Sequence, residues 1–170
     1  MVKRLLNSCK HLEFSISACT RTPREGEVHG KDYYFYKQEQ FEQLITEGAF
    51  AEWEMVYAGK YYGTLNSELQ RIWDEGKTPL VDIDVKGALA VKAKYPDNCL
   101  TIFIEAPSLE ALRERLKLRG TETDHSLEER VSKAATELTF APCFDRILVN
   151  DKLDVAAREL LEIVSDFSGC

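Results

Sequence analysis

The sequence predicts an α/β fold with a parallel sheet, preceded by a small β-rich part. From Pro79 onward, short apolar runs alternate with helical patterns in the order strand, helix, strand, helix. This order is typical of a parallel sheet with helices on both faces. Before Pro79, aromatic stretches of alternating polarity are broken by glycines, as in short β-strands. The length of 170 residues and the 44% hydrophobic content suit one globular domain.

The β-rich part contains three predicted strand regions and one helix, and a second helix leads out of it. Residues 13–17, 32–36 and 52–64 show the alternation of strands, and residues 38–48 have a helical pattern. A further helix is predicted over residues 65–76.

The α/β part begins with a predicted strand over residues 79–85 and a helix over residues 86–95, followed by a second apolar strand over residues 100–106. The remaining elements are predicted as helices over 108–120, 126–138 and 153–167 and a strand over 146–150. Ser108 is the expected N-cap of the first of these helices, and Ser126 with Glu129 forms the expected capping box of the second. Ligands of parallel sheets bind at the carboxyl ends of the strands, so the site is expected there.

The composition excludes several classes of function. A net charge of −7 argues against broad nucleic-acid binding, which needs a basic face. No apolar run approaches the roughly 20 residues that a membrane-spanning helix needs. The five cysteines are scattered and form no C-x-x-C pair, which signals neither a disulfide framework nor a zinc site. We therefore expect a cytoplasmic protein, in which a local basic pocket could still bind a small anion.

The stretch TRTPREGEVHGKDYYF, residues 20–35, places two arginines three positions apart on a rigid turn. The fixed φ of Pro23 would hold Arg21 and Arg24 in a constant relation, which suits a bound anion. The alternative is a solvated loop rich in turns. The motif G-x-x-x-x-G-K-[ST] of phosphate-binding loops is absent, because Arg71 stands where the first glycine would precede Gly76 and Lys77.

Carboxylates and a second group of arginines mark two further candidate sites. Asp82 and Asp84 would share one face of a strand among apolar neighbours, which predicts a metal or a hydrogen-bonding ligand. The alternatives are a satisfied core pair or a cap on the next helix. Arg119 precedes a glycine at a turn, where a hinged lid over a phosphate is one interpretation. A solvated helix face is the other interpretation for the arginines of that region.

Several motifs of the chain resemble those of guanylate kinase, the enzyme that transfers a phosphoryl group from ATP to GMP, and they occur in the same order. They are FSISACTRTPREGEVHGKDYYF, FAEWE, YYGT, LVDIDVKG, RLKLRGTE and ILVND. The resemblance runs from about Phe14 to the C-terminus. It implies one domain over residues 1–170 with a parallel core of the P-loop-kinase type, formed by residues 68–112 and 131–170. It also implies an inserted β-rich GMP-binding subdomain over residues 14–67 and a helical lid over residues 113–130.

The same resemblance implies a role for each residue at the GMP site. Arg21, Arg24, Tyr33 and Tyr62 would bind the GMP phosphate, because paired guanidinium groups suit its oxygens. Glu27 would support the two arginines. The guanine would be recognised by the following residues: Ser17, Glu52, Thr64 and Asp84.

For the ATP side, the resemblance implies that Asp82 faces a magnesium ion through water. Arg21, Arg119 and Arg130 would join it as catalytic residues that neutralise charge on the transferred phosphoryl group. Arg115 and Arg119 would contact ATP, with Asn150 near the adenine. The implied cofactors and partners are ATP, Mg²⁺ and GMP, without nucleic acid or membrane, in a monomer or homodimer.

The chain also departs from the family pattern at its start. Family members begin with a strand and a glycine-rich phosphate loop, whereas this sequence begins with MVKRLLN, which is similar to the helix after that loop. Without the loop, we expect impaired phosphoryl transfer and a stability below that of a full-length relative. The alternative function is a catalytically inactive guanylate-kinase-like module that binds phosphopeptides. A kinase for another nucleoside monophosphate would leave Glu52 unexplained.

Overall fold

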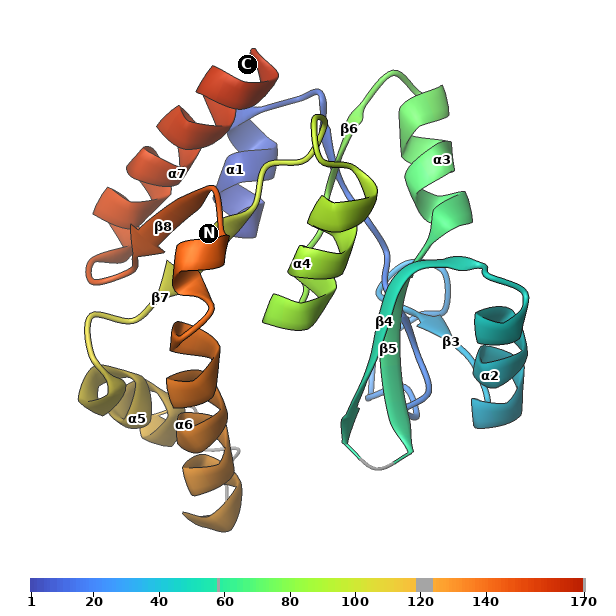
Figure 1. Ribbon diagram of the computed structural model, residues 1–170, viewed down its shortest axis with the longest axis horizontal. Helices are drawn as coiled ribbons and strands as arrows, with labels where there is room; N and C mark the ends of the chain where they lie inside the picture. Colours follow the sequence, from blue (N-terminus) through green and yellow to red (C-terminus); the bar gives the residue numbers. More distant parts are fainter. Residues whose placement is uncertain (58, 119–123, 170) are drawn as a thin grey trace. The chain divides into compact units, whose positions relative to one another are not determined.

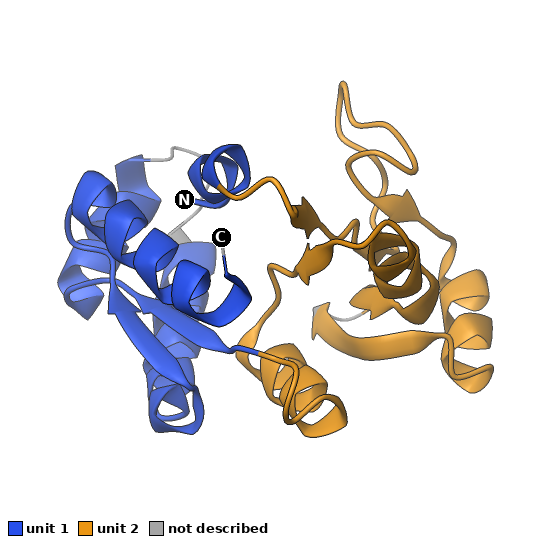
Figure 2. Cartoon of the chain, turned by 90° about the horizontal axis from the view of Figure 1, so that it is seen from above, with its two compact units in different colours: residues 1–8, 100–169 blue, residues 9–99, 170 orange. Residues whose placement is uncertain are grey.

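A computed structural model of the chain describes residues 1–57, 59–118 and 124–169. It divides into two compact units, one formed by residues 9–99 and the other by residues 1–8 together with 100–169 (Figure 2). This division does not test the predicted arrangement of GMP-binding subdomain, core and lid, which stays a prediction. Each unit contains a pair of parallel strands, which confirms the α/β class.

The unit of residues 9–99 holds two sheets. β1 (Leu12–Phe14) pairs in parallel with β6 (Thr78–Leu80). The second sheet has the strand order β3-β2-β5-β4, whose members are β3 (Tyr34–Phe35), β2 (Ala18–Cys19), β5 (Lys60–Leu65) and β4 (Phe50–Tyr57). β4 and β5 form the long antiparallel hairpin of Figure 1, and β2 adds to β5. The predicted β-rich part is therefore confirmed.

Three helices belong to this unit: α2 (Gln38–Thr46), α3 (Asn66–Asp74) and α4 (Val85–Lys94). α2 places Phe41, Leu44 and Ile45 on one face, the spacing of an amphipathic helix. Phe41 is fully buried, and its ring stacks on Phe50 at 4.4 Å and on Tyr61 at 5.4 Å between centroids. This aromatic cluster attaches α2 to the β4–β5 hairpin.

The strand predicted over residues 79–85 is shorter in the structure. β6 ends at Leu80, and residues 81–84 have no regular structure. Asp84 is the N-cap of α4, and its Oδ1 accepts a hydrogen bond from the Gly87 N–H at 2.9 Å. The pairing with β1 ends at Leu80, and the N-cap role of Asp84 starts a helix only four residues later, so the segment between them is too short to continue the strand. The expectation that both aspartates lie on one face of a strand was wrong.

The unit of residues 1–8 and 100–169 contains the parallel pair β7 (Ile102–Glu105) and β8 (Arg146–Val149). Its helices are α1 (Val2–Ser8), α5 (Leu109–Leu118), α6 (Asp124–Leu138), the 3-10 turn η1 (Ala141–Cys143) and α7 (Leu153–Ser168). The predicted alternation of strands and helices is confirmed here. Ser108 accepts a hydrogen bond from the Ala111 N–H, as predicted for an N-cap. Ser126 lies inside α6, which already includes Asp124, so the expected capping box was wrong.

The core of this unit follows the helical periodicity of its sequence. Leu116 of α5 packs against Leu127 and Val131 of α6. α7 buries Ala156, Leu160 and Val164 at intervals of four residues. Among the helices that the structure describes, none combines the length and apolarity needed to cross a bilayer.

Candidate functional site

A cavity of about 250 Å³ lies in the unit of residues 9–99. Six of the residues predicted for the site line it: Ser17, Tyr33, Glu52, Tyr62, Asp82 and Asp84. They come from segments far apart in the sequence, and the folding of the β4–β5 hairpin next to β2 and the start of α4 brings them together. Four other predicted residues do not line the cavity but contact one another or its lining: Arg21, Arg24, Glu27 and Thr64.

Glu52 places a buried carboxylate at one side of this cavity. It projects from β4 and is 7% exposed. The Thr64 hydroxyl, on the paired strand β5, donates a hydrogen bond to Glu52 Oε1 at 2.6 Å. Burial raises the pKa of Glu52, the hydrogen bond from Thr64 partly opposes this, and the nearby charge of Asp84 adds to it. A carboxylate in this state favours a ligand that offers it hydrogen-bond donors.

The start of α4 leaves room for that carboxylate because residue 87 is glycine. A Cβ atom placed on Gly87 would lie 2.7 Å from Glu52 Oε2 and 3.4 Å from Asp84 Oδ1. The first distance is shorter than a normal van der Waals contact, and the second is at the lower limit of one. Gly87 therefore permits the two carboxylates to lie beside the helix N-terminus, whose free N–H groups favour negative charge.

The loop of residues 20–33 holds a paired arginine and glutamate. Arg21 donates two hydrogen bonds to the Glu27 carboxylate, at 2.6 and 2.7 Å, and both side chains are mostly buried. Glu27 also accepts a hydrogen bond from the Arg24 backbone N–H at 2.7 Å. The hydrogen bonds from Arg21 lower the pKa of Glu27 to about 2, and the same pair raises the pKa of Arg21. Glu27 therefore holds the Arg21 side chain and the backbone of the turn at Arg24.

Two tyrosines surround the Arg21 guanidinium. Its central carbon lies 4.7 Å from the centroid of the Tyr33 ring, a cation–π distance. The Tyr33 and Tyr62 rings meet edge to face at 6.4 Å. Burial raises the pKa of Tyr62, and the charge of Arg21 beside it opposes the shift. The Arg24 side chain is exposed on the same loop. We call Arg21, Arg24, Tyr33 and Tyr62 the arginine–tyrosine group. It offers cationic and hydroxyl side chains near the cavity, which is the chemistry that a bound anion requires.

Several lining residues were not identified from the sequence: Glu54, Val56, Gly63 and Ile83. Glu54 and Val56 follow Glu52 at steps of two along β4, so they share its face. The alternation of the strand was a signal that could have identified them. Lys86 forms an ion pair with Glu54 at 3.0 Å.

Asp82 is exposed and lines the cavity, so the predicted burial of both aspartates was wrong for this residue. The described residues contain no group of three or more His, Cys, Asp or Glu side chains that could hold a metal ion. Mg²⁺ commonly binds through one or two carboxylates, with water and substrate phosphates as its other ligands. A single exposed carboxylate fits that mode of binding.

The other predicted residues belong to the unit of residues 1–8 and 100–169. Arg115 of α5 donates to the backbone carbonyls of Asn150, at 2.6 Å, and Asp151, at 2.8 Å. The structure thus brings Arg115 and Asn150 together at the end of β8. Arg130 is exposed on α6. Arg119 lies outside the described residues.

Comparisons with known proteins agree on one family. A sequence model of the guanylate kinase family matches residues 1–167. The chain is 42% identical to the guanylate kinase of Bacteroides thetaiotaomicron over 167 residues, covering 98% of this chain and 82% of that protein. It is 43% identical to the guanylate kinase of Porphyromonas gingivalis over 168 residues, covering 98% of this chain and 89% of the relative.

A solved structure of guanylate kinase from Anaplasma phagocytophilum aligns with a TM-score of 0.78 at 30% sequence identity. The alignment covers 96% of this chain and 80% of the other. Sequence and structure comparisons both extend over nearly the whole chain, and the chain therefore belongs to the guanylate kinase family.

Proposed function

We propose that this protein transfers a phosphoryl group from ATP to GMP, giving ADP and GDP. The observation that carries the proposal is the cavity of residues 9–99, which the buried Glu52 carboxylate and Tyr33 line, with Arg21 against the Tyr33 ring. The carboxylate suits a base with hydrogen-bond donors, and Arg21 with Tyr33 suits a phosphate. Family membership supports the same reaction.

Glu52 is proposed to recognise guanine. Guanine presents two adjacent donors, N1–H and N2–H, and a fixed carboxylate can accept both. Adenine presents an acceptor at the corresponding edge and would leave the buried carboxylate unpaired, which is costly in a closed site. Thr64 holds Glu52 in place, and Ser17 and Asp84 line the same cavity.

Arg21, Arg24, Tyr33 and Tyr62 are proposed to bind the GMP phosphate, with Glu27 holding Arg21. The bond to Glu27 occupies one edge of the guanidinium, which fixes the direction in which its remaining N–H groups point. The cation–π contact with Tyr33 fixes the plane of the group. An arginine held in this way loses little conformational freedom when an anion binds.

The ATP side of the reaction is assigned by family resemblance. Asp82 would hold Mg²⁺ through water, and the bound ion neutralises charge on the phosphates. Arg119 and Arg130 would stabilise the transferred group together with Arg21, while Arg115 and Asn150 would contact ATP. Phosphoryl transfer requires no covalent intermediate with the protein, so positioning and positive charge supply the catalysis. We place the reaction in the cytoplasm, in a monomer or homodimer, without nucleic acid or membrane.

The second candidate function, a phosphopeptide-binding module without activity, is less well supported. The relatives of about 40% identity are named as guanylate kinases. A phosphopeptide would use the arginine–tyrosine group, but it lacks the adjacent N1–H and N2–H donors that guanine offers to the buried Glu52 carboxylate.

The test is to titrate the chain with GMP, AMP and a phosphotyrosine peptide and to measure the midpoint of thermal unfolding. A ligand that binds only the folded state raises that midpoint by mass action. We expect stabilisation by GMP alone, and GDP formation from GMP with MgATP. Stabilisation by the peptide without stabilisation by GMP would overturn the proposal, and GMP binding without turnover would contradict its catalytic part.

Glu52→Gln separates recognition from stability. The variant presents an amide N–H₂ where guanine needs an acceptor, so GMP affinity is expected to fall roughly 10- to 100-fold. Because burial and Asp84 disfavour the charge of Glu52, its removal should leave the ligand-free thermal midpoint unchanged or higher. Calorimetric titration and thermal unfolding measure the two effects, and undiminished GMP affinity would refute the role of Glu52.

A further inference from the structure

Glu68 of α3 is a buried carboxylate that the proposed mechanism does not use. Its side chain is 1% exposed, and it accepts hydrogen bonds from three residues. Oε1 accepts from the Ile16 backbone N–H at 3.1 Å and from Arg71 at 2.9 Å. Oε2 accepts from the Tyr34 hydroxyl at 2.9 Å and from Arg71 Nε at 3.2 Å. Burying an ionised carboxylate away from water costs free energy unless hydrogen bonds replace those to water. These four donors supply such bonds to both oxygens of Glu68.

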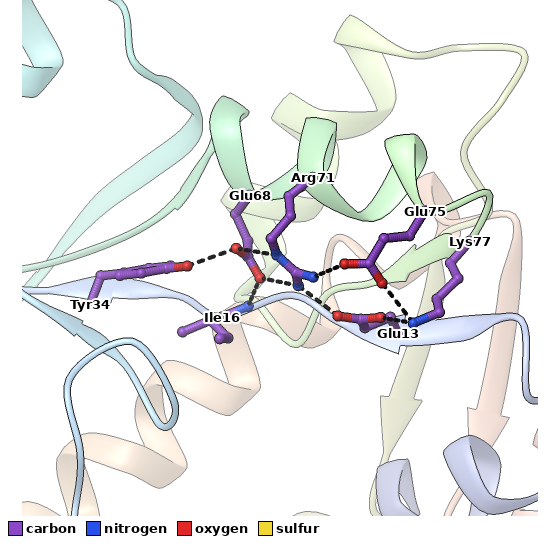
Figure 3. A network of polar contacts seen from close by, with 7 residues as sticks. All are labelled: Glu13, Ile16, Tyr34, Glu68, Arg71, Glu75 and Lys77. Carbon is purple, nitrogen blue, oxygen red and sulfur yellow. Dashed lines mark hydrogen bonds and ion pairs between the residues drawn. The ribbon is translucent and has the colours of Figure 1, made fainter.

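Figure 3 shows that Glu68 has different partners on its two sides. Tyr34 lies on one side, while Arg71 leads on the other to Glu75, Glu13 and Lys77. Burial alone would raise the pKa of Glu68, but the hydrogen bonds from Arg71, Ile16 and Tyr34 together hold it below its ordinary value. Glu68 therefore stays charged, and both of its oxygens accept hydrogen bonds from these partners.

The residues that Glu68 holds are the chain neighbours of two residues of the cavity. Ile16 precedes Ser17, and Tyr34 follows Tyr33, and both Ser17 and Tyr33 line the cavity. The Tyr34 N–H also donates to the Ser17 carbonyl at 2.9 Å, so these two segments are joined to each other as well. One carboxylate thus connects α3 to both segments at the positions next to the cavity.

We propose that Glu68 is a positioning residue for GMP, which holds Ser17 and Tyr33 in place through Ile16 and Tyr34. The inference rests on the proposed function of the cavity. Glu68 does not line the cavity and needs no contact with the ligand. Its effect is transmitted through two hydrogen bonds to the segments that carry the lining residues, whose displacement by a fraction of an ångström weakens binding.

Two variants and one control test the proposal. Glu68→Gln removes the charge and offers donors where Tyr34 and Arg71 need acceptors. Tyr34→Phe removes only the hydroxyl and keeps the ring in the core, so it tests the contact even where Glu68→Gln folds poorly. Glu75→Gln is the matched control, because Glu75 bonds to Arg71 at 2.8 Å and to Lys77 at 2.7 Å in the same network without contacting Ile16 or Tyr34.

The measurements are the dissociation constant for GMP by calorimetry, the KM for GMP and for ATP, and the thermal midpoint. Glu68→Gln is expected to weaken GMP binding about tenfold, the factor that corresponds to one charge-assisted hydrogen bond. Tyr34→Phe should weaken it by a smaller factor. Both should leave the KM for ATP unchanged, and Glu75→Gln should leave GMP binding unchanged.

Unchanged GMP affinity in folded Glu68→Gln and Tyr34→Phe would overturn the proposal and leave Glu68 a purely structural role. An equal loss in Glu75→Gln would also overturn it, because the effect would then belong to the network as a whole. Failure of the proposed function has a different signature, namely a wild-type chain that does not bind GMP. That result would overturn both proposals together.

Discussion

At the scale of single residues, the arginine that we assign to the GMP phosphate depends on a glutamate for its position. Glu27 accepts two hydrogen bonds from Arg21 and one from the Arg24 backbone. A bidentate pair of this kind fixes direction as well as distance. The spacing of the arginines in the sequence indicated an anion site, but only the pairing with Glu27 shows which guanidinium is held rigidly.

The Arg21–Glu27 pair leads to a prediction about acid stability. The pKa of Glu27 is lowered from 4.5 to about 2 in the folded state, so its charge stabilises the fold above pH 4.5. This contribution is lost as the pH falls from 4.5 toward 2, where the carboxylate takes up a proton in the folded state too. Glu27→Gln lacks it at every pH.

The midpoint of thermal unfolding, measured for both proteins from pH 7 to pH 2, checks this expectation. The wild type should unfold at a higher temperature than Glu27→Gln above pH 4.5, and the two midpoints should converge toward pH 2. Comparison with the variant removes the effects of other acidic groups, such as Glu13 and Glu128, whose pKa values are also lowered. A difference that stayed constant over the whole range would contradict the assigned ionisation.

At the scale of elements, the cavity depends on one glycine in the β4–β5 hairpin and one in α4, and an added Cβ atom would meet different obstacles at the two positions. Gly63 lies in β5, where a Cβ atom would be 2.8 Å from the backbone carbonyl of Glu52 and 2.9 Å from Phe50 and Trp53. Gly87 lies in α4, where a Cβ atom would meet the far end of the Glu52 side chain at 2.7 Å. The paired backbone beside Gly63 cannot move away from an added methyl group, whereas the Glu52 side chain beside Gly87 can rotate.

The two alanine variants are therefore expected to have opposite effects. Gly63→Ala should destabilise the fold by about 1–3 kcal/mol, as expected for an overpacked site. Gly87→Ala should leave stability unchanged or raise it by up to about 1 kcal/mol, because alanine favours helix. It should weaken GMP binding roughly tenfold, because Glu52 is displaced from its position.

Chemical denaturation and calorimetric titration of both variants separate these effects. Full GMP affinity in Gly87→Ala would show that the glycine does not serve the site. A stable Gly63→Ala would show that the hairpin can open to accept the methyl group.

At the scale of the whole molecule, all residues assigned to GMP belong to one of the two compact units, residues 9–99. Residues assigned to ATP, apart from Asp82, belong to the other unit or lie outside the described residues. The formal net charge of −7 is therefore compatible with an anionic substrate, because the positive charge that matters is local.

Hydrogen exchange tests the assignment of GMP to one unit. Binding of GMP should slow exchange of backbone amides in β2, in the loop that carries Arg21 and in the β4–β5 hairpin, because bound ligand reduces local opening. Amides of α7 should exchange as in the free protein. AMP at the same concentration is the control and should give no protection. Protection confined to residues 100–169 would place the GMP site in the other unit.

The sequence by itself determined the α/β class and the family, and it predicted most of the candidate site. Strands and helices with strong periodicity, such as α5 and α7, were identified because their pattern depends only on local spacing. Arg21, Glu27, Glu52, Tyr33 and Tyr62 were identified because their motifs occur in the order expected of the family.

Only the tertiary structure decided which of these residues meet and in what state. Asp84 was expected in a strand, with a cap on the next helix as one alternative, and the structure shows the cap on α4. Asp82 was expected to be buried and is exposed, because β6 ends at Leu80 and Asp82 lies in the irregular segment after it. The contacts of Glu68 with Ile16 and Tyr34 span 52 and 34 positions, so no local pattern could reveal them. The burial of a side chain and the identity of its partners depend on contacts between residues far apart in the sequence, and only the folded chain brings such residues together.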